Sequence, residues 1–65
     1  MQANYDPDAD ALYLRLAEAK VIESEEIRPG IVFDFDAEGR VVGIEILDAS
    51  EHIAAGADFA ALTAA

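Results

Sequence analysis

Three aspartates near the start of the chain have the spacing of a calcium-binding loop. Asp6, Asp8 and Asp10 stand at alternate positions, as do the first three ligands of an EF-hand. The rest of that loop is missing, because Ala11 stands where the motif needs glycine and Ala17 where it needs a bidentate glutamate. We therefore predict a turn whose carboxylates accept hydrogen bonds locally, as N-cap side chains do.

A second group of acids is predicted to share one face of a β-sheet. Strand alternation places Asp34, Asp36 and Glu45 opposite the Phe and Ile side chains, on the same face as Tyr13 and Arg15. Carboxylates beside a tyrosine can bind a divalent metal ion or act as acid and base. The pattern is equally that of a solvated face on which Arg15 pairs with Asp34 or Glu45, worth about 0–1 kcal/mol.

Apolar side chains on that face favour a third interpretation. Val32, Val41 and Leu47 lie among the acids, and a mixed apolar and acidic surface is one that a protein partner or a second copy would cover. We predict a partner-binding face with no catalytic, cofactor-binding or metal-binding residues. Its candidate residues are Tyr13, Arg15, Val32, Asp34, Asp36, Val41 and Glu45.

Other site-forming motifs are absent from the sequence. His52 is the only histidine and there is no cysteine, so no zinc site can be assembled, and we predict that His52 lies on the surface of a helix. No serine or threonine has the context of a nucleophile, and no phosphate-binding glycine motif occurs. We expect a protein that is not an enzyme and uses no cofactor.

The net charge restricts the kinds of partner. The chain has 14 Asp and Glu against 4 Lys and Arg, a formal net charge of −10. Nucleic-acid binding needs clustered basic residues, and these are scattered singly, so no direct binding to DNA or RNA is expected. A negative field favours encounter with basic proteins, although acidity can also serve solubility alone.

Length and composition indicate one small domain over residues 1–65. A chain of 65 residues has room for one core, and 54% hydrophobic residues is typical of a folded protein. No apolar run approaches the roughly 18 residues of a membrane span. The absence of cysteine and of a basic, apolar leader predicts a cytoplasmic protein.

Alternation and turn residues predict four or five short strands. Pro29 and Gly30 predict a type II turn, with Gly30 at positive φ. Residues 21–27 alternate weakly, which indicates an edge strand or a bulge. The expected strands are residues 2–5, 11–16, 21–27, 31–35 and 42–46.

The hairpin formed by the last two strands has two possible registers. Gly39 favours a three-residue loop, which would pair Phe33 with Gly43 and mix the two faces. A one-residue slip exposes a whole apolar face, at about 1.5–3 kcal/mol per large side chain. We therefore predict a four-residue loop or an equivalent bulge. The predicted pairs are Phe33 with Ile44, Phe35 with Val42 and Ile31 with Ile46.

The hydrophobic period changes after Leu47. Asp48 is predicted to cap a helix with Glu51 in its first turn, Gly56 to interrupt it, and residues 58–62 to form a second short helical turn. The predicted fold is α+β, a small antiparallel β-meander of 4–5 strands with a C-terminal helix packed on one face. The predicted core is Leu12, Leu14, Leu16, Ile31, Phe33, Phe35, Val42, Ile44, Ile46, Ile53 and Phe59.

Several motifs together resemble the DUF2283 (YuzE-like) family of small bacterial and archaeal proteins. The motifs are YDPDADALYL at residues 5–14, PGIV at 29–32, DFD at 34–36, GR at 39–40 and GIEILDAS at 43–50. The resemblance covers residues 1 to about 52 and ends in an Ala-rich tail. It implies a small antiparallel sheet with a C-terminal helix and no established catalytic residues. Families of this kind resemble components encoded beside small ribonuclease-fold toxins, which implies an antitoxin-like role.

Three functions remain open on the sequence. The leading one is a non-catalytic binding module whose acidic sheet face or strand edge binds a small basic protein. The resemblance implies that this role is antitoxin-like. The second is a structural homodimer, because one short helix cannot cover the sheet. The third is a metal-dependent or acid-base enzyme using Asp34, Asp36 and Glu45.

Overall fold

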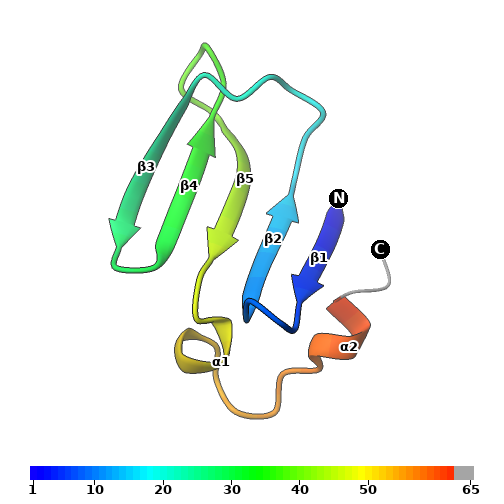
Figure 1. Cartoon of the computed structure of the whole chain (residues 1–65). Coiled ribbons are helices and arrows are strands. Elements are labelled where there is room, and N and C mark those ends of the chain that lie inside the picture. The colour runs from blue at the N-terminus through cyan, green and yellow to red at the C-terminus, as the bar shows by residue number, and fades with distance from the viewer. Residues whose placement is uncertain (63–65) are drawn as a thin grey trace.

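The computed structural model describes residues 1–62 and shows one antiparallel sheet with two short helices (Figure 1). This confirms the predicted α+β fold. The strands are β1 (Gln2–Asp6), β2 (Ala11–Arg15), β3 (Glu23–Arg28), β4 (Ile31–Phe35) and β5 (Val41–Ile46), and the helices are α1 (Ala49–His52) and α2 (Phe59–Leu62).

The spatial order of the strands is β1-β2-β5-β4-β3. After β2 the chain crosses to the far edge of the sheet and returns through β3, β4 and β5, so that β5 lies beside β2 (Figure 1). The two edges are therefore β1 and β3. The weak alternation of residues 21–27 is explained, because β3 is an edge strand with a bulge between Glu26 and Arg28.

The register of the β4–β5 hairpin confirms the prediction in its bulged form. Phe33 pairs with Ile44 and Ile31 with Ile46, as predicted. The predicted pair of Phe35 with Val42 is wrong, because the register shifts after Asp34 and Phe35 pairs with Val41. The carboxylate of Asp36 holds the turn, since it accepts hydrogen bonds from the backbone amides of residues 38 and 40. The shift leaves Val42 almost fully buried.

The register also assigns each strand residue to one side of the sheet, because directly paired residues share a face. The apolar face contains the side chains of Ala3, Tyr5, Leu12, Leu14, Ile31, Phe33, Phe35, Val42, Ile44 and Ile46. The polar face contains those of Tyr13, Arg15, Ser24, Val32, Asp34 and Glu45.

Helix α1 closes one end of the sheet by joining two turns. Its Ala49 is fully buried and donates its amide to the carbonyl of Asp10 at 2.8 Å. Ser50 donates its hydroxyl to the Asp10 carboxylate at 2.6 Å. The exposed His52 lies at the other turn, where a Cβ on Gly30 (φ +85°) would come within 2.7 Å of the imidazole Cε1.

The predicted helix start is only partly correct. Asp48 precedes α1, but its side chain makes no capping hydrogen bond, because the residue adopts a left-handed conformation with φ 49° and ψ 50°. The helix is also a single turn, and Gly56 at φ +99° separates it from α2. No helix within residues 1–62 is long and apolar enough to cross a membrane.

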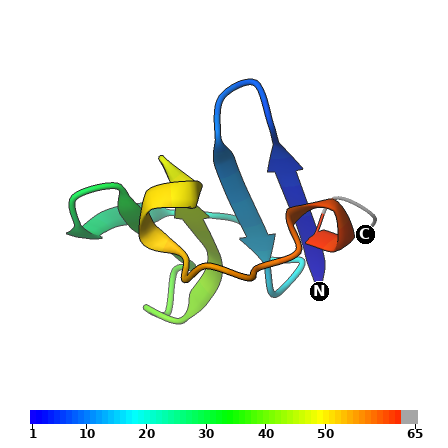
Figure 2. The same ribbon diagram turned by 90° about the horizontal axis from the view of Figure 1, so that it is seen from below.

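Helix α2 packs beside the edge strand β1 (Figure 2). The ring of Phe59 stacks on that of Tyr5, with 4.6 Å between the centroids. The carboxylate of Asp58 accepts a hydrogen bond from the amide of Ala61 and so caps the helix. Because Tyr5 belongs to the apolar face, α2 covers the β1 side of that face.

The core is smaller than predicted. Among the described residues, the buried apolar side chains are those of Ala3, Leu12, Val42 and Ala49. The prediction for Leu16 is wrong: it is 44% exposed, because β2 ends at Arg15. The remaining predicted core residues are half-buried, namely Leu14, Ile31, Phe33, Phe35, Ile44, Ile46, Ile53 and Phe59.

Candidate functional site

A cluster of hydrogen-bonded side chains occupies the centre of the polar face. Asp34 is only 4% exposed, and Ser24 on the neighbouring strand donates its hydroxyl to the Asp34 carboxylate at 2.6 Å. Strand pairing places Gly43 on the other side of Asp34. A Cβ on Gly43 would lie 2.5 Å from the Tyr13 hydroxyl oxygen and 2.9 Å from the carbonyl oxygen of Leu14. The tyrosine thus lies across the glycine, above β5.

The negative charge of Asp34 acts on the Tyr13 hydroxyl across this gap. Burial raises the pKa of Tyr13 above its usual 10.0, and the negative charge of Asp34 raises it further. The phenol therefore remains protonated at neutral pH. Gly43 is required here because any side chain would occupy the space of the ring.

Glu45 completes the cluster from β5. Burial raises the pKa of this carboxyl above 4.5, and the neighbouring Asp34 raises it further. Asp34 thus lies among Ser24, Tyr13 and Glu45, and the hydrogen bond to its carboxylate comes from Ser24. No buried side-chain nitrogen or oxygen within the described part of the chain lacks a hydrogen-bond partner. The polar groups of the cluster are therefore satisfied, and its four residues come from four neighbouring strands of the sheet.

The expected ion pair of Arg15 with Asp34 or Glu45 is wrong. Arg15 binds the Glu18 carboxylate at 2.9 Å and the Ala19 carbonyl at 3.1 Å instead. Glu18 and Ala19 follow β2 closely in the chain, so the guanidinium can bind them without extending across the sheet.

The predicted trio of Asp34, Asp36 and Glu45 is not assembled either. Asp36 is engaged by backbone amides in the β4–β5 turn and by Arg40 at 3.5 Å. Within residues 1–62 no three His, Cys, Asp or Glu side chains are grouped so as to hold a metal ion. Of the seven candidate residues, the structure brings together Tyr13, Asp34 and Glu45, with Val32 beside Glu45 in the same row.

The aspartates at the first turn have structural partners. Asp6 accepts the backbone amide of Asp8 at 3.0 Å, as predicted for a turn. The Asp10 carboxylate accepts hydrogen bonds from the Tyr5 and Ser50 hydroxyls, each at 2.6 Å. The hydrogen bonds from Ser50 and Tyr5 lower the pKa of Asp10, so its carboxylate is ionised and joins β1 to α1.

The apolar face, which the sequence indicated as core, lacks a complete second layer. Leu14, Phe33, Phe35 and Ile44 lie across its centre and remain half-buried, while α2 packs at the β1 side. The rings of Phe33 and Phe35 contact each other at 6.4 Å between centroids. This surface was missed as a candidate site because periodicity identifies an apolar face without showing what covers it.

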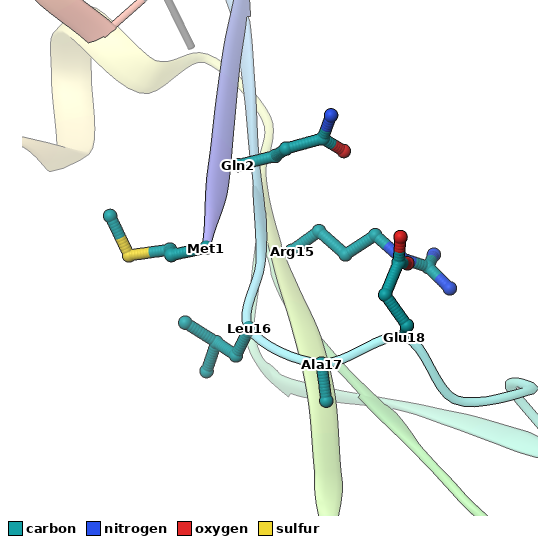
Figure 3. Close-up of a pocket in the computed structure, with 6 residues that line it drawn as sticks. All are labelled: Met1, Gln2, Arg15, Leu16, Ala17 and Glu18. Atoms are coloured by element: carbon teal, nitrogen blue, oxygen red, sulfur yellow. The ribbon is translucent and has the colours of Figure 1, made fainter.

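A hollow of about 140 Å³ marks the corner where this face ends (Figure 3). Met1 and Leu16 point to one side of it, and Gln2, Arg15 and Glu18 point to the other. Leu16 thus continues the apolar surface beyond the end of β2. The polar side of the corner is occupied by the ion pair of Arg15 with Glu18.

Edge strand β3 borders the apolar face on the side away from α2. All its residues are exposed. Glu23 pairs with Phe35 and Glu25 with Phe33, so both glutamates stand at the rim of the apolar face. The candidate binding surface is therefore an apolar patch with an acidic border.

These features define a small α+β protein with a single antiparallel sheet, one face of which is internally bonded and the other incompletely covered. The chain belongs to the family "Protein of unknown function (DUF2283)", which matches residues 2–50. The match spans all five strands and the first residues of α1, and it confirms the resemblance seen in the motifs. No curated protein and no solved structure matches the chain.

Proposed function

We propose that this chain is a non-catalytic protein-binding module whose apolar face is covered by a small basic protein. The observation that supports this most directly is the half-buried state of Leu14, Phe33, Phe35 and Ile44. A sheet face of this kind is stabilised when a second layer removes it from water, by about 25 cal/mol per Å² of apolar area. Helix α2 supplies that layer only beside β1.

Charge selects the partner. The chain has a net charge of −10, and Glu23 and Glu25 stand at the rim of the exposed face. A partner with an apolar centre and Lys or Arg at its rim would match both features, and long-range attraction would speed its association. A second copy of the chain matches the apolar centre but brings the same negative charge.

A small basic toxin of the ribonuclease type has the required chemistry. The family resemblance supports an antitoxin-like role, in which the acidic rim occupies basic residues that the toxin uses to bind RNA phosphates. Binding and inhibition would then be the same event. The chain itself supplies no catalytic group in this role.

The first test asks whether a small basic protein is encoded next to this chain and whether the two associate; the lack of any such neighbour or partner would contradict the proposal. Co-expression is expected to give a complex that weakens steeply with salt, while sedimentation of the chain alone gives a monomer at micromolar concentration. A stable homodimer that leaves no apolar surface for the basic protein would overturn the proposal in favour of a second copy as the occupant.

A matched pair of leucines tests which face is used. Leu16 and Leu47 are 44% and 45% exposed, but Leu16 extends the apolar face, whereas Leu47 lines a hollow with Tyr13 and Glu45 on the polar side. Leu16→Gln is expected to weaken the complex about fivefold to tenfold, because a partly exposed leucine loses its apolar contact. Leu47→Gln is the control and should leave the affinity unchanged.

Calorimetry or surface binding at constant salt gives the two dissociation constants. Both substitutions keep the net charge, so electrostatic steering is unchanged between them. If Leu47→Gln alone weakens the complex, the binding surface is the polar face predicted from the sequence, and the assignment to the apolar face is wrong.

A further inference from the structure

We infer that the basic partner adds a β-strand to the free edge of β3, antiparallel or parallel to it, with its basic side chains beside Glu23 and Glu25. The inference rests on the proposed function and specifies the geometry of the same complex. Strand addition supplies main-chain hydrogen bonds that an apolar patch alone cannot provide.

The two edges of the sheet differ in how they are protected. Strand β1 has α2 packed beside it, with Phe59 stacked on Tyr5. Strand β3 pairs only with β4, and each of its residues is exposed. An open edge presents unpaired backbone amides and carbonyls, which is the template that an added strand needs. The open edge is therefore β3.

The side chains of β3 determine which strand can pair there. Glu23, Glu25 and Glu26 give it a strongly negative character, against a single positive charge at Arg28. Two copies pairing edge to edge would bring these glutamates together, and like charges on neighbouring strands are destabilising. A lysine- or arginine-rich strand would be attracted by the same residues. Charge thus argues against a second copy and for a basic strand.

The residues of β3 divide into two groups by their internal bonds. Ser24 donates to Asp34, and Glu26 accepts the Gly30 amide at 3.2 Å. Glu23 and Glu25 form no ion pair within residues 1–62 and stand on the apolar side, paired with Phe35 and Phe33. These two glutamates are available to the partner. A partner strand bound at this edge would place its basic side chains beside the two glutamates. The rest of the partner could then cover the apolar face.

The bulge sets where pairing ends. The register of β3 against β4 shifts between Glu26 and Arg28, and a bulge interrupts the regular edge and twists it away. Arg28 would also repel basic side chains of the partner. The added strand is therefore confined to the segment from Glu23 to Glu26.

The experiment is a nuclear magnetic resonance titration of the full chain with a synthetic peptide of alternating lysine and valine. At millimolar peptide, shifts and slowed amide exchange are expected at residues 23–26. A second peptide with the same side chains but alternate backbone amides methylated cannot make the main-chain hydrogen bonds. It is expected to bind at least about tenfold more weakly.

A matched pair of charge variants separates strand addition from general attraction. Glu23→Lys/Glu25→Lys is expected to abolish the shifts in β3. Asp8→Lys/Glu51→Lys changes the net charge equally at exposed residues outside this strand and should preserve those shifts. Both variants should retain the spectrum of the folded sheet, because the four residues are exposed.

Three results would overturn the inference: no perturbation of β3, equal binding of the methylated peptide, or equal loss in the two charge variants. Each leaves the proposed function intact if the co-expressed basic protein still binds and Leu16→Gln still weakens the complex. Conversely, the chain could bind the lysine peptide at β3 and fail to bind the co-expressed protein. That result would contradict the proposed partner and leave the strand geometry supported.

Discussion

The two faces of the sheet satisfy their side chains in opposite ways. On the polar face Asp34 is 4% exposed and accepts a hydrogen bond from Ser24, and its charge acts on Tyr13 and Glu45 on two further strands. On the apolar face Phe33 and Phe35 touch each other and remain half-buried. On the face that looked functional in the sequence the buried polar groups are satisfied, whereas the face that looked like core is only partly covered.

The difference follows from the nature of the two interactions. A hydrogen bond is satisfied by one well-placed neighbour, so a few side chains on adjacent strands can complete a polar cluster within one layer. Apolar surface is removed from water only by an area of other atoms, which requires a second layer. Here α1 lies at the end of the sheet and α2 beside β1. A polar face whose groups are satisfied can serve structure alone, and the partly covered apolar face is the surface that we propose for partner binding.

The largest predicted effect on stability comes from a substitution at the closest contact of the polar face. Gly43→Ala places a methyl group 2.9 Å from the Leu14 carbonyl and against the Tyr13 phenol, so the backbone or the ring must shift. We expect a loss of about 2–3 kcal/mol in the free energy of unfolding, measured by urea titration.

The control for this substitution is a double-mutant cycle with Tyr13→Ala. Removing the ring takes away one of the two clashes, so Gly43→Ala should cost less in that background. An equal cost in both backgrounds would show that the tyrosine does not lie across the glycine.

A smaller loss is expected when Asp34 is deprived of one donor. Ser24→Ala removes the 2.6 Å hydrogen bond from a nearly buried carboxylate, at a cost of about 1–2 kcal/mol by the same urea titration. Glu25→Ala, one residue away on the opposite face and exposed, serves as the control and should change stability by no more than about 0.5 kcal/mol. Similar values for the two variants would mean that the polar cluster does not hold β3 to the sheet.

Local patterns in the sequence were sufficient to predict the strands and their sidedness. Alternation placed Phe33 opposite Ile44, and the Pro29-Gly30 pair identified a turn whose glycine has φ +85°. Both signals are carried by neighbouring residues, whose geometry the chain fixes locally. The bulge at Phe35 was allowed for because the apolar pattern outweighs the preference of Gly39 for a shorter loop.

What the sequence could not indicate depends on contacts between distant segments. Tyr13, Asp34 and Glu45 meet only because β5 lies between β2 and β4, and Gly43 becomes essential only in that arrangement. Arg15 and Leu16 were misjudged for a related reason: alternation does not show that β2 ends at Arg15 or that Glu18 follows within reach.

The smallest predicted effect concerns the proton shared within the polar cluster. Because burial and Asp34 raise the pKa of Glu45 above 4.5, protonation favours the folded state. This contribution is fully present below the pKa of the unfolded chain and is lost as the pH rises through the higher folded pKa. Glu45→Gln keeps a donor for Asp34 and removes the charge. The variant is therefore expected to be more stable than the parent at about pH 7, by less than about 1 kcal/mol.

The gain from Glu45→Gln should shrink as the pH falls towards about 4, where Glu45 is protonated in the parent. Asp10 and Asp36 have lowered pKa values and lose their stabilising contributions in acid, but they do so in both proteins, so the difference between variant and parent isolates Glu45. Glu51→Gln, at an exposed position on α1, provides the matched control with the same change in charge. Melting curves across this pH range measure the effect. A gain that does not depend on pH, or one that Glu51→Gln reproduces, would show that net charge and not the contact with Asp34 governs the stability of the polar face.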